Sequence, residues 1–92
     1  MKNEKRTNYD YTIIASVSLP RKEYVLGKTK KETGKKQYVT WCCVNKTNYS
    51  CGHYLADKDI AMKDMYERVQ KEVNYRIDKL EQKIKEKGGE NK

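Results

Sequence analysis

Residues 11–19 read YTIIASVSL and are followed by Pro20. Every second residue from Tyr11 is apolar, and this period of two is typical of a half-buried β-strand. The residues predicted to share the buried face are Tyr11, Ile13, Ala15, Val17 and Leu19. Because proline cannot donate a hydrogen bond to a neighbouring strand, we expect the strand to end before Pro20.

Three further strands are predicted downstream, at about residues 23–30, 37–45 and 48–55. The links between them are short and polar, which favours an antiparallel meander of four strands. A two-residue turn at Lys46 and Thr47 would set the register of the last hairpin. The pairs that it predicts are Cys42 with Cys51, Trp41 with Gly52, Thr40 with His53, and Val39 with Tyr54.

The rest of the chain predicts one long helix over about residues 58–87. Asp57 is a suitable N-cap, and Gly88 and Gly89 end the segment. The fold class is therefore α+β: a four-stranded antiparallel meander with the C-terminal helix packed on one face. We expect a single domain over residues 9–87, between a flexible basic arm at 1–8 and a flexible tail at 88–92.

An apolar stripe follows the predicted helix: Met62, Tyr66, Val69, Val73, Ile77, Leu80 and Ile84. Such a helix is about 45 Å long, whereas a strand of eight residues spans only about 26 Å. We therefore expect the helix to overrun the sheet by about four turns. This leaves Ile77, Leu80 and Ile84 either as a dimer contact between helices or as a frayed end covered by lysine stems. The residues predicted near the core are Ile13, Val17, Leu26, Met62, Tyr66, Val69 and Val73.

The charge is unevenly distributed. The 92 residues carry a formal charge of +8, and residues 1–56 hold eleven Lys or Arg against four acids, while residues 57–92 hold ten against nine. A basic half beside a balanced half points to a polyanionic partner. The predicted binding residues are Arg21, Lys22, Lys28, Lys30, Lys31, Lys35 and Lys36, interleaved with Tyr24 and Tyr38.

Two explanations remain open for these residues. Lysine neutralises phosphate and tyrosine stacks on bases, which together predict a nucleic-acid surface that reads the backbone rather than the bases. Alternatively, the lysines only keep the chain in solution. The tyrosines could likewise fill a thin core in a sequence that has no Phe.

The sequence offers little for catalysis or metal binding. Cys42, Cys43, Cys51 and His53 lack the spacing of a zinc site, since adjacent residues of a strand point to opposite faces. Cys51 and His53 have no orienting carboxylate nearby in the sequence. We expect free thiols, no metal, no cofactor and no enzymatic activity.

Several short segments together resemble a group of mobile-element proteins. They are SVSLP at 16–20, EYVLG at 23–27, YVTWC at 38–42 and GHY at 52–54. Over about residues 11–68 the chain resembles small accessory proteins of phages and conjugative elements in low-GC Gram-positive bacteria. That group includes anti-CRISPR proteins, so the resemblance implies interference with a host defence system such as CRISPR-Cas.

Two functions follow as expectations. The first is a non-enzymatic binding protein for nucleic acid or a nucleoprotein complex, acting by occlusion as a mobile-element inhibitor. The alternative is a protein–protein interaction module that forms a homodimer through the helix and binds an acidic protein surface. No apolar run approaches the roughly 20 residues of a membrane span, and there is no apolar secretory signal. We therefore expect no membrane partner and a cytoplasmic location in the bacterial host cell.

Overall fold

The computed structural model describes residues 6–31 and 36–87. The chain forms five antiparallel strands in sequential order and one helix. The elements are β1 (Thr7–Asn8), β2 (Tyr11–Leu19), β3 (Lys22–Thr29), β4 (Tyr38–Val44), β5 (Asn48–Leu55) and α1 (Lys58–Glu86). The predicted α+β class is confirmed, with one strand more than expected, because Thr7 and Asn8 pair with the start of β2.

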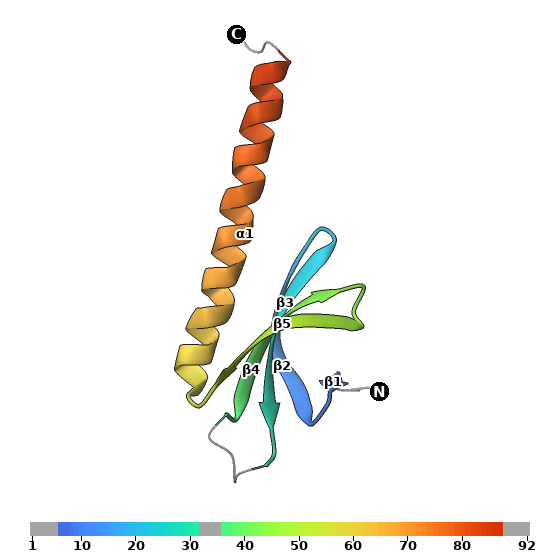
Figure 1. Cartoon of the computed structure of the whole chain (residues 1–92), viewed down its shortest axis with the longest axis vertical. Coiled ribbons are helices and arrows are strands. Elements are labelled where there is room, and N and C mark those ends of the chain that lie inside the picture. The colour runs from blue at the N-terminus through green and yellow to red at the C-terminus, as the bar shows by residue number, and fades with distance from the viewer. Residues whose placement is uncertain (1–5, 32–35, 88–92) are drawn as a thin grey trace.

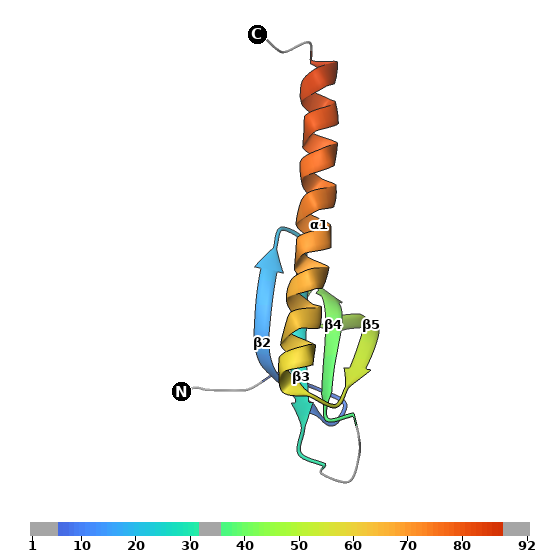
Figure 2. The same ribbon diagram turned by 90° about the vertical axis from the view of Figure 1, so that its left-hand side faces the viewer.

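The sheet has an apolar cluster on each face. Figure 2 shows α1 lying across one face. The cluster between sheet and helix contains Tyr24, Leu26, Tyr38, Ala61 and Met65. The cluster on the opposite face contains Val25, Val39, Trp41 and Cys43. Successive residues of β3 therefore enter different clusters, so this central strand is buried on both sides.

A β-bulge at Ile14 divides β2 into two parts that face opposite ways. Ile13 pairs with Gly27 and Ala15 pairs with Leu26, which leaves Ile14 without a partner. The predicted single apolar face of this strand is therefore wrong, since one extra residue reverses the alternation. The residues before the bulge, Tyr11 and Ile13, pack against the Trp41 cluster, whereas those after it, Ala15, Val17 and Leu19, pack on the helix side.

The last hairpin has a three-residue turn, since Val44 pairs with Asn48. Near the turn Cys42 therefore pairs with Ser50, and the predicted pairing with Cys51 is wrong. A second bulge, at Cys51 and Gly52 with φ of 55° at Cys51, then adds one residue to β5.

Beyond this bulge the predicted register returns. Thr40 pairs with His53, and Val39 pairs with Tyr54, as expected. The predicted contact between Trp41 and Gly52 is also present. A Cβ on Gly52 would lie 2.9 Å from the indole nitrogen of Trp41, so no larger residue fits without a shift of the ring.

The sheet curls around Trp41. The Trp41 ring meets Tyr11, Tyr49 and Tyr54 edge-on, with centroids 5.6, 5.4 and 6.5 Å away. The ring centroids of Tyr11 on β2 and Tyr54 on β5 are 6.2 Å apart. In a flat sheet these two strands would be separated by about 14 Å. The curl therefore brings the two outer strands together over a shared aromatic cluster.

Arg6, just before β1, joins β3 to β5 across the curled sheet. Its guanidinium donates hydrogen bonds to Glu23 at 2.8 Å and to the Tyr49 hydroxyl at 2.9 Å. Its carbonyl accepts from the amide of Ile13. Residues 6–8, which the sequence assigned to a basic arm, are thus part of the folded domain. The remaining arm residues 1–5 and the predicted tail 88–92 lie outside the described residues.

The helix begins where predicted. Asp57 is its N-cap, with a carboxylate oxygen 2.9 Å from the amide nitrogen of Ile60. Ala61 and Met65 are buried against the sheet, and Met62 and Val69 pack at the edge of the same cluster. Among the described residues, Arg76 makes the last hydrogen bond from α1 to the rest of the fold, 2.8 Å to the carbonyl of Pro20 in the turn between β2 and β3.

The C-terminal part of α1 then extends beyond the sheet (Figure 1). The ten residues after Arg76 span about 15 Å, close to three turns rather than the four expected.

Candidate interaction surfaces

Four lysines gather where β3 ends and β4 begins. We call Lys28, Lys30, Lys31 and Lys36 the lysine end. Lys28 pairs across the sheet with Tyr38, which in turn pairs with Leu55, shortly before the start of α1. The lysine end therefore lies beside the N-terminus of α1, far from the free end of the helix (Figure 1).

Most of the lysine end is unneutralised. Lys31 forms an exposed ion pair with Asp10 at 2.7 Å, and this hydrogen bond raises the pKa of Lys31. Lys28, Lys30 and Lys36 are exposed and form no ion pair with another described residue. The Lys36 amine donates only to the carbonyl of Tyr54, at 3.4 Å. Lys35, also predicted as a binding residue, lies outside the described residues.

Arg21 and Lys22 lie at the opposite end of β3. The eight residue steps from Lys22 to Lys30 span about 26 Å, so the seven predicted basic residues do not form one surface. Lys22 pairs with Glu72 on α1 at 3.2 Å. Burial lowers its pKa, but the hydrogen bond to Glu72 and the neighbouring charges together outweigh burial, and the pKa is raised overall. Lys22 thus helps to hold the helix.

The predicted stacking role of Tyr24 and Tyr38 is wrong. Both rings are buried between the sheet and α1, with 7% and 9% exposure. Burial raises the pKa of Tyr24. The open explanation that tyrosine fills the core in place of Phe therefore holds for these two residues.

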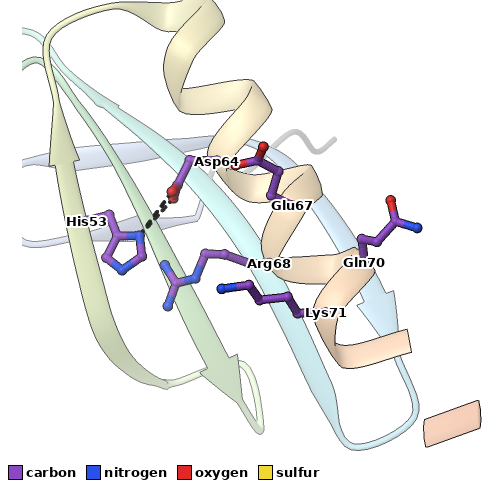
Figure 3. A pocket seen from close by; sticks show the side chains of 6 residues that line it. All are labelled: His53, Asp64, Glu67, Arg68, Gln70 and Lys71. Atoms are coloured by element: carbon purple, nitrogen blue, oxygen red, sulfur yellow. Dashed lines mark hydrogen bonds and ion pairs between the residues drawn. The ribbon is translucent and has the colours of Figure 1, made fainter. Parts of the chain in front are cut away.

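A polar cluster joins α1 to β4 and β5. His53 on β5 and Asp64 on α1 point toward each other in Figure 3, with 2.9 Å between Nδ1 and the carboxylate. The Thr40 hydroxyl donates to the same carboxylate. Burial raises the pKa of Asp64, but the hydrogen bonds from Thr40 and His53 and the charges of His53 and Arg68 together outweigh burial, and the pKa is lowered overall.

Arg68 completes this cluster one turn along the helix. Its guanidinium donates to the carbonyl and hydroxyl of Thr40, at 3.1 and 3.0 Å, and to the carbonyl of Cys51 at 2.7 Å. It also lies over the Tyr24 ring, 5.8 Å from the centroid. Because its donors form hydrogen bonds to β4 and β5, Arg68 holds the helix against the sheet.

A shallow cleft of about 390 Å³ opens over the polar cluster (Figure 3). It is lined by His53, Asp64, Glu67, Arg68, Gln70 and Lys71. Asp64 and Arg68 were not among the site residues predicted from the sequence. Their spacing of four, beside Ala61 and Met65, was the available signal that they share the sheet-facing side.

The structure corrects the expectation for His53, since Asp64 orients its ring across the helix–sheet boundary. Within residues 6–31 and 36–87, no hydrogen bond joins His53 to Cys51. All three cysteines carry free thiols, as predicted. In the same ranges no three His, Cys, Asp or Glu side chains are placed to hold a metal ion.

A second surface follows the outer side of α1. The row formed by Tyr66, Val73, Ile77, Leu80 and Ile84 is called the outer row. Ile77, Leu80 and Ile84 are 46%, 56% and 57% exposed, and Tyr66, which was predicted near the core, is 53% exposed. Val73 is half-buried and belongs to neither apolar cluster. Most of this apolar row is therefore left uncovered by the rest of the described chain.

Comparison with protein-family models, with curated proteins and with solved structures found no match to this chain. Over the part of the chain that the structure describes, no helix is both long and apolar enough to cross a membrane.

Proposed function

We propose that this protein is a non-enzymatic binding protein whose lysine end contacts the phosphate backbone of a nucleic acid or of a nucleoprotein complex. The observation that carries the proposal is the convergence of Lys28, Lys30 and Lys36 at one end of the sheet, exposed and without ion pairs to described residues. Exposed lysines without ion-pair partners act as point charges toward phosphate.

The mode of binding follows from what the surface lacks. Tyr24 and Tyr38 are buried, so neither ring is available to stack on a base. Lysine does not form the bidentate pairs by which arginine reads guanine. Binding is thus tolerant of sequence and strongly dependent on salt.

A biological setting comes from the resemblance of residues 11–68 to small phage and conjugative-element proteins. Occlusion of phosphates that belong to guide or target strands is a mechanism suited to an inhibitor of a defence complex. The lysine end is the surface that such an inhibitor would place against the complex.

The test is fluorescence anisotropy with short single- and double-stranded DNA and RNA across a salt series. Three phosphate contacts predict a slope of about −2.7 in log K against log salt on duplex DNA. Changing Lys28, Lys30 and Lys36 to Glu is expected to reduce affinity at least tenfold. Circular dichroism of each variant checks that the fold is retained.

The matched control changes Lys71, Lys79 and Lys85 to Glu, which alters the net charge equally but on the helix. Its affinity should fall much less than that of the lysine-end variant. Equal losses in the two variants would show a nonspecific charge effect and contradict the proposed surface.

A second candidate function rests on the outer row of α1, which is apolar and largely uncovered. In this alternative the protein is a dimeric protein–protein interaction module, and its lysines meet carboxylates of an acidic protein. The absence of nucleic-acid binding even at low salt, together with self-association, would favour this alternative.

A further inference from the structure

The outer row has the spacing of a coiled-coil seam. Val73, Ile77, Leu80 and Ile84 are separated by steps of four, three and four residues. In a heptad labelled a to g, the isoleucines take position a, while valine and leucine take position d. A β-branched residue at a with leucine at d favours two-stranded parallel coiled coils.

This seam is distinct from the sheet-facing side of α1. At 100° per residue, the outer row lies about a quarter turn from the line through Ala61, Met65 and Val69. The sheet and a second helix can therefore contact α1 at the same time. Tyr66, at the next d position toward the N-terminus, continues the exposed seam alongside the sheet.

The two flanks of the seam carry opposite charge. The e flank contains Glu67, Asn74 and Glu81, and the g flank contains Val69, Arg76 and Lys83. Arg76 uses its Nε and one Nη to hold Glu72 and Pro20, which leaves its other Nη for a further partner. One side of the seam is therefore acidic and the other is basic.

Because the two flanks carry opposite charge, the seam is electrostatically complementary to the seam of a second copy in only one orientation of the two helices. In a parallel pair, g positions face e positions, so Arg76 meets Glu81 of the second copy, twice per dimer. In an antiparallel pair, g faces g, and Arg76 meets Lys83. We propose that two copies of this protein pair in parallel and in register through the outer row.

The size of the contact sets its strength. Residues 66–84 span about 27 Å of helix, a small interface at the weak end of the specific range. The dissociation constant of the dimer is therefore expected to be in the micromolar range, about 10⁻⁶ to 10⁻⁴ M.

Parallel pairing has a consequence for the lysine end, and this part rests on the proposed function. The lysine end lies beside the N-terminus of α1, so a parallel dimer presents both lysine ends in the same direction. An antiparallel dimer would point them apart. Two lysine sets on one side can engage a single polyanion with gain from avidity.

Sedimentation equilibrium over a concentration series tests the pairing. The natural sequence is expected to shift from monomer to dimer, and Ile77→Gln with Ile84→Gln to remain monomeric. The matched control is Tyr75→Gln, since Tyr75 is 57% exposed on the same segment but lies outside the seam. A natural chain that stays monomeric at millimolar concentration, or a control that dissociates equally, would overturn the proposal.

Spin labels on Lys63→Cys test the orientation. Lys63 is exposed, and the labels go on a background of Cys42→Ala and Cys51→Ser. A parallel pair predicts a label separation below about 25 Å, and an antiparallel pair at least about 35 Å. The longer separation would overturn the proposal. Neither measurement involves nucleic acid, so failure of the pairing and failure of the proposed function are distinguishable.

Discussion

Two rows of side chains on α1 differ in what they contact. The sheet-facing row contains Ala61, Met65, Arg68, Glu72 and Arg76, and the outer row is the apolar row defined above. The sheet-facing row is part polar, because Arg68, Glu72 and Arg76 lie beside Ala61 and Met65 and bind the strands. The outer row is almost wholly apolar, yet most of it is left uncovered by the described chain. The more hydrophobic row of a helix is thus not always the row that holds the fold, and it can indicate a partner instead.

The largest expected effect separates the two rows directly. Met65→Ala leaves a cavity under the helix and should lower the free energy of unfolding by about 3 kcal/mol. Leu80→Ala removes a similar volume from an exposed site and should change the stability of the dilute monomer by less than about 0.5 kcal/mol. Urea denaturation at low protein concentration measures both.

If Leu80→Ala destabilised the dilute monomer as much as Met65→Ala, the outer row would be part of the folded core. The distinction between the two rows would then be lost. At high protein concentration, by contrast, Leu80→Ala is expected to be costly, because it removes one layer of the pairing.

The next effect tests the polar part of the sheet-facing row. Arg68→Ala leaves the Thr40 carbonyl without the guanidinium and should cost about 2 kcal/mol. Lys71→Ala, in the same cleft but without a hydrogen bond to described residues, should cost less than about 0.5 kcal/mol. Thermal unfolding of the two variants compares them, and equal costs would argue against Arg68 as the residue that fastens the helix.

Acid should weaken the sheet-facing row before it affects the outer row. The hydrogen bond from Arg76 lowers the pKa of Glu72, and Thr40 and His53 lower that of Asp64 despite its burial. A lowered folded-state pKa adds stability that is complete above the unfolded values of 4.5 and 3.8 and is lost as the pH falls toward the folded-state pKa.

Denaturation measured from pH 6 to pH 2 should therefore show decreasing stability below about pH 4.5. Asp64→Asn with Glu72→Gln should be less stable at pH 6 and should lose less on acidification. An unchanged pH dependence in this variant would show that other carboxylates dominate.

The smallest expected effect is confined to the turn between β4 and β5. Lys46 has φ of 66°, a conformation that favours glycine. Lys46→Gly should raise stability by about 0.5–1 kcal/mol, since it removes left-handed strain from a non-glycine residue. Thr47→Gly, in the same turn but without a positive φ, should instead lower stability by a few tenths of a kcal/mol. Denaturant midpoints distinguish the two signs.

The elements themselves could be predicted from local sequence. Period-two alternation gave β2, and the Asp57 cap marked the start of α1. The bulges at Ile14 and at Cys51 could not be predicted, because nothing local distinguishes an extra residue from regular alternation. Each bulge nevertheless decides which side chains share a face.

The surfaces were harder to predict than the elements. The exposure of Ile77, Leu80 and Ile84 followed from comparing helix and strand lengths. The burial of Tyr24 and Tyr38 did not, because the sequence does not say which face of the sheet the helix covers. The separation of Lys22 from Lys30 depended on the length of β3.

Hydrogen exchange along α1 at low and high protein concentration distinguishes the two rows of the helix. The amides of residues 77–86 are expected to exchange fast in dilute solution and to gain protection as concentration rises. The amides of residues 61–72, which the sheet covers, should remain protected at both concentrations. Equal protection of the two segments at every concentration would contradict the assignment of the outer row to a second copy of the chain.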